Sequence, residues 1–420
     1  MQADSGRIEQ ADLAVRYAQI RGATVALAQG LSAEDCALQS MPDASPVKWH
    51  MAHTTWFFET FVLERHAARH EPFHPAFRYL FNSYYNSLGE QFSRPRRGML
   101  SRPGLDDILR YRSHVDARLL SLLQDGALPA EVRALVSLGL NHEQQHQELI
   151  LTDLKHLLSL NPLAPAYRKG DLEPSAPAAP LEFRRFEAGN VEIGHDGTGF
   201  AFDNELPRHR QHVAPFELAS RPVTNGEFLA FIEDGGYRRP EFWLSEGWNM
   251  VTTQRWEHPV YWHKLDGAWY EFTLRGLQPL DRHRPLTHIS HFAADAYAHW
   301  ASARLPTEFE WEIAAADASL DGNFVESGEL HPRPTAAGAL AAMHGDVWEW
   351  THSSYAPYPG YKPAPGAVGE YNGKFMSNQY VLRGGSCATP ASHIRRSYRN
   401  FFPSSARWQF SGLRLARDAS

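Results

Sequence analysis

Two histidines that are four residues apart, His142 and His146, lie in a stretch whose apolar residues recur with helical spacing. On a helix, positions i and i+4 share one face and lie one turn apart, so both imidazoles can bind a single metal ion. The stretch also matches the His-Glu-x-x-His pattern of zinc proteases, in which Glu143 would be the general base. The spacing therefore predicts a metal site and leaves its chemistry open between hydrolysis and another metal-dependent reaction.

A third imidazole is available from Trp49-His50-Met51-Ala52-His53, near the start of a separate predicted helix. His50 and His53 are both candidates, because positions i and i+3 of a helix also lie close together. Three neutral imidazoles would leave a divalent ion with its full charge and with several open coordination positions. A hydrolytic zinc site normally needs one open position, whereas several open positions could admit several bound molecules together.

The composition is that of a globular protein with more than one core. The chain has 420 residues, 43% of them hydrophobic and 21% charged, which predicts two domains. Its 41 basic and 48 acidic residues give a net charge of −7, which argues against nucleic acid or an anionic membrane as a partner. No apolar run approaches the ~20 residues that span a bilayer, and the N-terminal residues are unlike a signal peptide. Because only Cys36 and Cys387 occur, we expect a cytoplasmic protein without disulfides.

Long segments of the first half have the periodicity of amphipathic helices. They are residues 12–29, a stretch that starts after Ser45-Pro46, residues 106–123 and residues 131–160. Ser45 is expected to cap the second helix, with Pro46 in its first turn. A long excursion separates the second and third segments. The pattern predicts a four-helix bundle in a first domain of residues 1–165, with the metal ligands facing the bundle core.

The second half of the chain has a different texture. Residues 166–182 are rich in Pro and Ala and are expected to form a linker. Residues 183–420 consist of short segments with many Gly, Pro and Trp, which predicts an irregular α+β domain. The predicted fold class is therefore α+β multidomain, with the helical bundle first.

Several blocks of this second half resemble the formylglycine-generating-enzyme (sulfatase-modifying) family, in the same order. The blocks are Ile289–Ala298, Arg304–Glu312, Gly345–Trp350, Leu382–Ser386 and Gly412–Leu415. The resemblance implies a C-type-lectin-like core, and it is specific for fold rather than for activity. Formylglycine-generating enzymes bind copper through a pair of cysteines after the Arg-Gly-Gly-Ser block. Cys387 stands alone in that region, so formylglycine synthesis is not expected.

The first half resembles the DinB-like helical bundles, whose members bind a metal ion through three histidines. Joined in this order, the two halves resemble the iron-dependent sulfoxide synthases of ergothioneine biosynthesis over nearly the whole chain. That resemblance implies Fe(II) as the cofactor, with His53, His142 and His146 as its ligands. It also implies a reaction in which O2 is used to join a thiol sulfur to C2 of the imidazole of hercynine, which is trimethylhistidine.

The resemblance assigns substrate contacts as well. Gln145 would orient the imidazole of hercynine. Arg94 and Arg97 would hold the carboxylate of the thiol substrate, which a guanidinium can bind through two hydrogen bonds. The segment Asn400-Phe401-Phe402 would meet the trimethylammonium group, because a cation without N–H donors binds best to aromatic faces. Members that use γ-glutamylcysteine have an aspartate at the position of Phe402, so free cysteine is the expected thiol.

A tyrosine is expected to donate the proton that the oxygen chemistry requires. Some members of the family use a tyrosine of the second domain, which Tyr358 matches. Others carry a Tyr-Tyr pair in the first domain, which Tyr84 and Tyr85 match. We favour Tyr84 and Tyr85, because the adjoining sequence resembles the members with that pair.

Other functions remain open at this point. A selenoneine synthase would use the same architecture to join a selenosugar to hercynine. An ovothiol-type synthase would act on C5 of histidine, although such enzymes usually carry a further methyltransferase domain. A zinc hydrolase that uses Glu143, or a metal-free binding module with a lectin-like fold, would represent different classes. The expected partners are small molecules only, namely hercynine, cysteine or a selenium donor, and O2.

Overall fold

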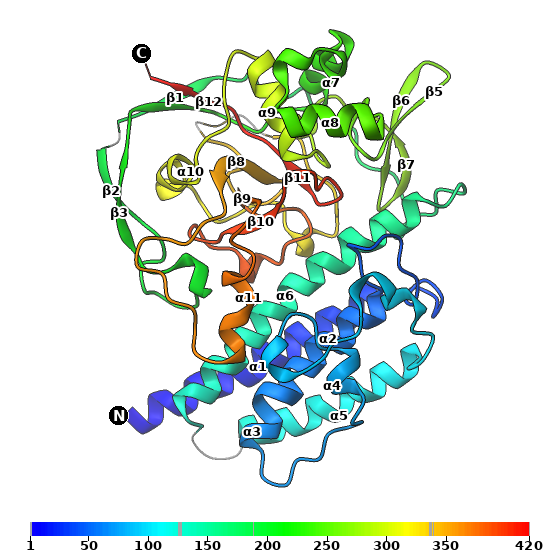
Figure 1. Ribbon diagram of the computed structural model, residues 1–420, viewed down its shortest axis with the longest axis vertical. Helices are drawn as coiled ribbons and strands as arrows, with labels where there is room; N and C mark the ends of the chain where they lie inside the picture. The colour runs from blue at the N-terminus through cyan, green and yellow to red at the C-terminus, as the bar shows by residue number, and fades with distance from the viewer. Residues whose placement is uncertain (1, 125–127, 188, 336–337, 339, 420) are drawn as a thin grey trace. The chain divides into compact units, whose positions relative to one another are not determined.

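Two compact units make up the chain, shown together in Figure 1. The computed structural model describes residues 2–124, 128–187, 189–335, 338 and 340–419. The first unit comprises Met1–Leu160 with Pro365–Tyr371, and the second comprises Asn161–Ala364 with Asn372–Ser420. Within the described ranges, no helix is both long enough and apolar enough to cross a membrane.

The first unit is a helical bundle, as the apolar periodicity predicts. In its third long helix, Ile108, Tyr111, Val115 and Leu119 are buried, at the spacing that turns one helix face toward a core. The long helices of this unit, among the residues described, are α1 (Gln2–Ala28), α2 (Val47–Phe58), α5 (Leu105–Gln124) and α6 (Ala130–Ser159).

Short elements connect the second and third long helices. α2 continues through a π-helical turn, η1 (Glu59–Leu63), into α3 (Glu64–His66). Turns of this kind are often found near functional sites. The excursion that follows contains α4 (Phe77–Leu80), η2 (Asn86–Leu88) and η3 (Arg94–Met99).

Ser45 does not cap α2, so this prediction is wrong. Pro46 occupies the N-cap position, and no side chain caps the helix. The backbone N–H of Ser45 instead donates to Asp153 over 2.8 Å, and its hydroxyl accepts a hydrogen bond from Arg97 over 2.9 Å. The hydroxyl of Ser45 therefore takes part in a tertiary contact, whereas the local rule for N-capping had predicted it at the start of α2.

The second unit contains small sheets rather than one large sheet. The strand orders are β1-β4-β12, β10-β9-β8-β11, β2-β3 and β5-β6-β7. Neighbouring strands are antiparallel except β8 and β11, which are parallel. The described strands are β1 (Phe183–Phe186), β2 (Gly189–Ile193), β3 (His209–Val213), β4 (Phe216–Ala219), β5 (Trp262–Leu265), β6 (Ala268–Thr273), β7 (Gly276–Pro279), β8 (Trp348–Ser354), β9 (Gln379–Arg383), β10 (Asn400–Pro403), β11 (Ser411–Gly412) and β12 (Ala416–Asp418).

Helices and short 3-10 turns connect these strands. The remaining helices are α7 (Asn225–Glu233), α8 (Ser245–Gln254), α9 (His291–Trp300), α10 (Glu308–Ala314) and α11 (Glu370–Gly373). α10 begins with a capping box, in which Thr307 Oγ1 accepts a hydrogen bond from the N–H of Glu310.

Buried ion pairs join segments of this unit that are far apart in the sequence. The pairs are Glu308–Arg399, Glu312–Arg383 and Glu349–Arg414. Each carboxylate and each guanidinium is buried, so losing one partner would leave an uncompensated charge in the interior. Each pair therefore links two distant segments of the second unit through charges that are buried together.

In the first unit, α2 and α6 approach each other closely at Gly139. A Cβ atom on Gly139 would lie 2.5 Å from Cε1 of Phe58 and 2.8 Å from Cε1 of Phe57. Contacts this short are repulsive, so a residue without a side chain is needed to permit this helix spacing. His142 follows about one turn later on α6, and the close approach brings its imidazole toward α2.

Gly139→Ala is expected to destabilise the first unit by about 1–3 kcal/mol, because the new methyl group overpacks an aromatic contact. Gly22→Ala is the matched control, since Gly22 is exposed on α1 and its added Cβ would meet no atom within 4 Å. This control should stabilise the unit by roughly 0.5–1 kcal/mol through the better helix propensity of Ala. Urea unfolding followed by circular dichroism measures both, and equal effects would contradict the tight contact at Gly139.

Candidate metal centre

Three buried histidines from two helices converge in the first unit. His53 comes from α2, and His142 and His146 come from α6. One ring nitrogen of each lies within 4.8 Å of the corresponding nitrogens of the other two. The Nε2 atoms of His142 and His146 are 3.1 Å apart. The structure thus brings together the three residues that the sequence resemblance names as ligands.

The ring of His53 is fixed on both faces and at one edge. It stacks between Trp49, with centroids 4.8 Å apart, and Trp56, with centroids 5.5 Å apart. Its Nδ1 lies 2.6 Å from the carbonyl oxygen of Phe81, to which it donates. That bond leaves Nε2 as the nitrogen with a lone pair for a metal ion.

His50 does not join this group. Its Nδ1 lies 2.8 Å from Nδ1 of His146, and its Nε2 lies 3.0 Å from Oδ2 of Asp153. The spacing allowed His50 or His53 as the third member. The structure places His53 in the group, and His50 contacts His146 from outside it.

Burial keeps these imidazoles neutral. It lowers the pKa of His142 to about 4, and it lowers the pKa of His53 and of His146 well below the usual value, with repulsion from neighbouring histidines adding to the effect. Neutral imidazoles offer lone pairs to a metal ion at pH 7. Three such donors around one point fit a divalent transition metal.

Glu143 cannot serve as a general base beside this group. It is fully buried, where it accepts hydrogen bonds from Arg21 and Arg112 over 2.8 Å each and from Thr24 over 2.6 Å. Burial alone would raise the pKa of Glu143, but the two guanidinium charges outweigh it and lower the pKa to about 2. With both oxygens engaged, the carboxylate is a structural anion, which removes the basis of the zinc-hydrolase alternative.

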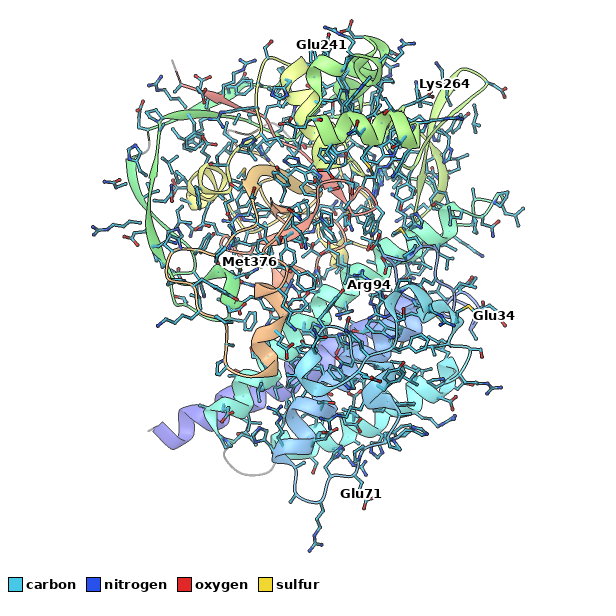
Figure 2. All side chains as sticks on the ribbon, viewed as in Figure 1. Glu34, Glu71, Arg94, Glu241, Lys264 and Met376 are labelled. Atoms are coloured by element: carbon cyan, nitrogen blue, oxygen red, sulfur yellow. The ribbon has the colours of Figure 1, made fainter. Side chains whose placement is uncertain are left out.

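The segment that carries Tyr84 and Tyr85 is attached to the same region. Ser83 Oγ accepts a hydrogen bond from Arg97 over 2.9 Å, and the phenol oxygen of Tyr84 accepts one from Arg94, labelled in Figure 2, over 2.7 Å. The preceding residue, Phe81, holds His53 through its carbonyl. The structure therefore brings the tyrosine pair and both arginines together near the histidine group.

Tyr371 is a further aromatic residue near the histidines, and the sequence did not indicate it. Its ring centroid lies 6.0 Å from that of His142 and 6.3 Å from that of Tyr84. The neighbouring Glu370 accepts hydrogen bonds from the backbone N–H groups of Asn86 and Ser87. The only signal was an aromatic residue in a Gly- and Pro-rich segment, which is too weak to assign a position.

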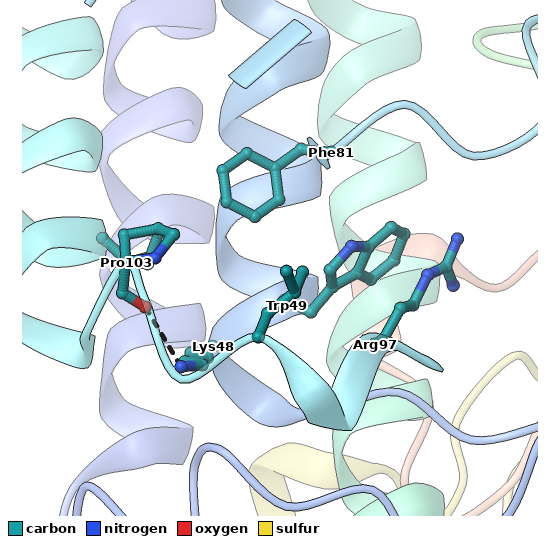
Figure 3. Close-up of a pocket in the computed structure, with 7 residues that line it drawn as sticks. Lys48, Trp49, Phe81, Arg97 and Pro103 are labelled. Atoms are coloured by element: carbon teal, nitrogen blue, oxygen red, sulfur yellow. Dashed lines mark hydrogen bonds between the residues drawn. The ribbon is translucent and has the colours of Figure 1, made fainter. Parts of the chain in front are cut away.

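Arg97 is a buried cation that lies on an aromatic ring. Its guanidinium carbon is 3.3 Å from the ring centroid of Trp49, and burial lowers the pKa of Arg97 to about 9. A cavity of about 10 Å³ beside it is lined by Lys48, Trp49, Phe81, Arg97 and Pro103, among others (Figure 3). Such a cavity holds about one water molecule, so it is too small to be a substrate pocket.

Tyr358 lies in the buried network of the second unit. Its hydroxyl donates to Oε2 of Glu308 over 3.3 Å, and the guanidinium carbon of Arg399 is 4.0 Å from its ring centroid. Burial raises the pKa of Tyr358 well above its usual value. The hydroxyl and the ring of Tyr358 therefore both take part in the buried contacts of the second unit.

Phe401 and Phe402 are consecutive residues of β10 and therefore point to opposite faces of the sheet. Phe401 stacks on Tyr355 with centroids 4.0 Å apart, whereas Phe402 meets Trp408 edge-on at 6.2 Å. The side-chain oxygen of Asn400 accepts a hydrogen bond from the N–H of Phe401. The two phenylalanines thus belong to separate aromatic contacts rather than to one surface.

Comparison with known proteins decides the family. The chain is 32% identical to a hercynine oxygenase of Mycolicibacterium thermoresistibile, over 97% of this chain and 95% of that protein. It is also 32% identical to a hercynine oxygenase of Mycobacterium tuberculosis, over 97% of this chain and 98% of that protein. The chain belongs to the hercynine oxygenase family.

The domain composition of this member of the hercynine oxygenase family agrees with the prediction. The DinB superfamily matches residues 16–150, and the sulfatase-modifying factor enzyme 1-like domain matches residues 170–339 and 333–419. A formylglycine-generating enzyme of Streptomyces coelicolor is 28% identical over 59% of this chain and 93% of that enzyme. The predicted fold class, a DinB-like bundle followed by a formylglycine-generating-enzyme-like domain, is confirmed.

Glu143→Gln is expected to destabilise the first unit by about 3–5 kcal/mol, because two buried guanidinium groups lose their shared carboxylate. Glu64→Gln is the control, since Glu64 pairs with the half-exposed Arg78 and its loss should cost less than about 1 kcal/mol. Denaturant unfolding of both variants measures the difference. Similar, small losses would show that the buried pairs do not stabilise the bundle.

Proposed function

We propose that the chain is an Fe(II)- and O2-dependent sulfoxide synthase that joins the sulfur of a thiol to C2 of the imidazole of hercynine. The observation that carries the proposal is the buried group of three neutral histidines, in a chain whose relatives are named hercynine oxygenases. The thiol S–H and the imidazole C–H give up their hydrogens in this reaction. One atom of O2 becomes the sulfoxide oxygen and the other leaves as water, so atoms and electrons balance.

His53, His142 and His146 would hold the iron. Bound there, Fe(II) would supply the one-electron chemistry that O2 needs in order to react with closed-shell molecules. Three protein ligands leave room for both substrates and O2, which a reaction of three molecules requires. The stacking of His53 between two tryptophans would keep this ligand in place while the other positions are filled.

Arg97 would bind the carboxylate of the thiol substrate. Its hydrogen bonds go to the hydroxyl groups of Ser45 and Ser83, and it forms no ion pair with a carboxylate in the described part of the chain. A buried cation without an anionic partner is stabilised when an anion binds beside it. Arg94, which holds Tyr84, would extend this positive surface. Free cysteine remains the proposed thiol, because Phe402 replaces the aspartate of members that use γ-glutamylcysteine.

The sequence resemblance assigns two sets of contacts to hercynine. Gln145, half-buried between the ligand positions of α6, would orient the imidazole so that C2 faces the sulfur. The trimethylammonium group would contact aromatic rings of the Asn400-Phe401-Phe402 segment. Because the two phenylalanines point to opposite faces of β10, one of them serves this role. Phe401, which already stacks on Tyr355, is the better candidate.

Tyr84 or Tyr85 would deliver the proton to the reacting oxygen. Tyr84 is partly exposed, and the hydrogen bond from Arg94 uses a lone pair of its oxygen rather than its proton. Tyr85 is buried against Trp56 and Phe61, and burial raises its pKa, so the phenol stays protonated. We propose that one of the two phenols gives its proton to the reacting oxygen, and burial favours the protonated form of Tyr85.

Reconstitution tests the function directly. The purified chain is loaded anaerobically with Fe(II) and then given hercynine, cysteine and O2, and the product mass is measured. We expect the mass of the cysteine–hercynine sulfoxide. His53→Ala should lose most of the bound iron and nearly all product, whereas His114→Ala, in the partly exposed part of α5, should keep both. A selenosugar that reacts in place of cysteine, or a chain that binds no iron, would contradict the proposal.

Removing the proton donor should change the product rather than abolish substrate binding. Tyr84→Phe or Tyr85→Phe is expected to lower sulfoxide formation by roughly a hundredfold, the lower range for a general acid, while oxidation of the thiol alone continues. Mass spectrometry gives the ratio of the two products, and iron content is the check on folding. If Tyr358→Phe alone shifts the ratio, the donor belongs to the second unit.

A further inference from the structure

His50 links one of the three clustered histidines to a buried carboxylate. Nδ1 of His50 lies 2.8 Å from Nδ1 of His146, and Nε2 of His50 lies 3.0 Å from Oδ2 of Asp153. All three side chains are at least nine-tenths buried. We propose that His50 and Asp153 are a positioning pair that holds His146 in the tautomer that binds a metal ion through Nε2. The inference rests on the proposed metal centre and adds two residues to it.

The direction of each hydrogen bond follows from counting protons. A carboxylate can only accept, and Oδ2 of Asp153 accepts from the N–H of Ser45 over 2.8 Å and from Nε2–H of His50. A neutral imidazole carries one N–H, so Nδ1 of His50 is then bare. It accepts the Nδ1–H of His146, which leaves Nε2 of His146 bare. That nitrogen is the one that lies 3.1 Å from Nε2 of His142, inside the histidine group.

The opposite arrangement is disfavoured. If His50 donated from Nδ1, its bare Nε2 would lie 3.0 Å from the carboxylate oxygen, with no proton between two buried acceptors. Leaving buried polar atoms unpaired in this way costs about 1–3 kcal/mol, and more when one of them is charged. Asp153 therefore selects the tautomer of His50, and His50 selects the tautomer of His146.

The chain geometry makes this link rigid. Asp153 follows His146 by two turns on the same face of α6, and His50 reaches both from α2. The N–H of Ser45 binds the carboxylate from the residue before the α2 N-cap. Asp153 thus ties the start of α2 to α6 and orients His50 at the same time.

The three ligands consequently have different partners. Nδ1 of His53 donates to the carbonyl of Phe81, and Nδ1 of His146 donates to His50. Nδ1 of His142 has no hydrogen-bond partner in the described part of the chain. Partners of this kind raise the basicity of a ligand, and a carboxylate-linked one does so most. His146 is therefore expected to be the strongest donor of the three.

Titration of the metal-free protein with Co(II), followed by absorbance or calorimetry, tests the pair without turnover. His50→Leu should weaken binding by about 10–100-fold, the usual effect of removing a ligand's hydrogen-bond partner. His50→Asn should recover part of this loss, because its Oδ1 branches from Cγ as Nδ1 does and can accept from His146. His156→Leu is the control, since His156 lies on α6 and contacts Ser40 instead, and it should leave the affinity unchanged.

A double-mutant cycle separates positioning from packing. Asp153→Leu should weaken Co(II) binding more in the wild-type background than in the His50→Asn background, where only its bond to Ser45 remains to be lost. A purely structural role of Asp153 would give equal losses in both backgrounds and overturn the proposal.

Three other results would also overturn it. If His50→Leu bound Co(II) with wild-type affinity, the His50–Asp153 pair would not contribute to metal binding. Loss equal to that of His53→Ala would make His50 a ligand. Equal affinities of His50→Asn and His50→Leu would exclude the acceptor role. A wild-type chain that binds no Co(II) would instead remove the metal centre itself, so failure of the proposed function is recognised separately.

Discussion

The buried carboxylate of Glu143 is the contact on which the histidine group depends. It lies on α6 next to His142 and binds Arg21 of α1 and Arg112 of α5. Successive helix positions differ by about 100° around the axis, so fixing Glu143 toward α1 and α5 turns His142 toward α2. His146 lies one turn further on the same face. The rotation of α6 is therefore set by a buried charged contact, while apolar packing at Gly139 sets its distance from α2.

What could be predicted from the sequence depended on how local each signal was. The spacing of His142 and His146 is a property of one helix, and the structure gathers both as the spacing predicts. The spacing of His50 and His53 left either as the third member, because what turns His53 inward is the carbonyl of Phe81 and the flanking tryptophan rings. Ser45 was assigned to a helix cap by a local rule and is used instead by Asp153 and Arg97. Contacts between segments that are far apart in the sequence produce no periodic pattern, so they could not be predicted.

The second unit shows why its fold could be predicted from the sequence more easily than the role of Tyr358. Its sequence blocks contain both members of the buried pairs Glu312–Arg383 and Glu349–Arg414, and removing one partner would leave the other charge buried alone. Tyr358 belongs to the same network through its bond to Glu308. Packing and this hydrogen bond already give Tyr358 a structural role, so a matching position does not by itself identify a proton donor. Its position in the sequence carried the fold but could not assign the proton donor.

Electrostatic repulsion limits which substrates can bind at a metal centre made of neutral histidines. A divalent ion held by three neutral imidazoles keeps its charge of +2, and the buried Arg97 adds another positive charge nearby. With an effective dielectric constant of about 20, a cationic group about 8 Å from the ion would be opposed by roughly 4 kcal/mol. An anionic thiol near the ion and a carboxylate near Arg97 would offset most of that opposition. If the site is filled as proposed, the anionic thiol would lower the electrostatic cost of binding a cationic group, and aromatic faces are the suitable partners of that group.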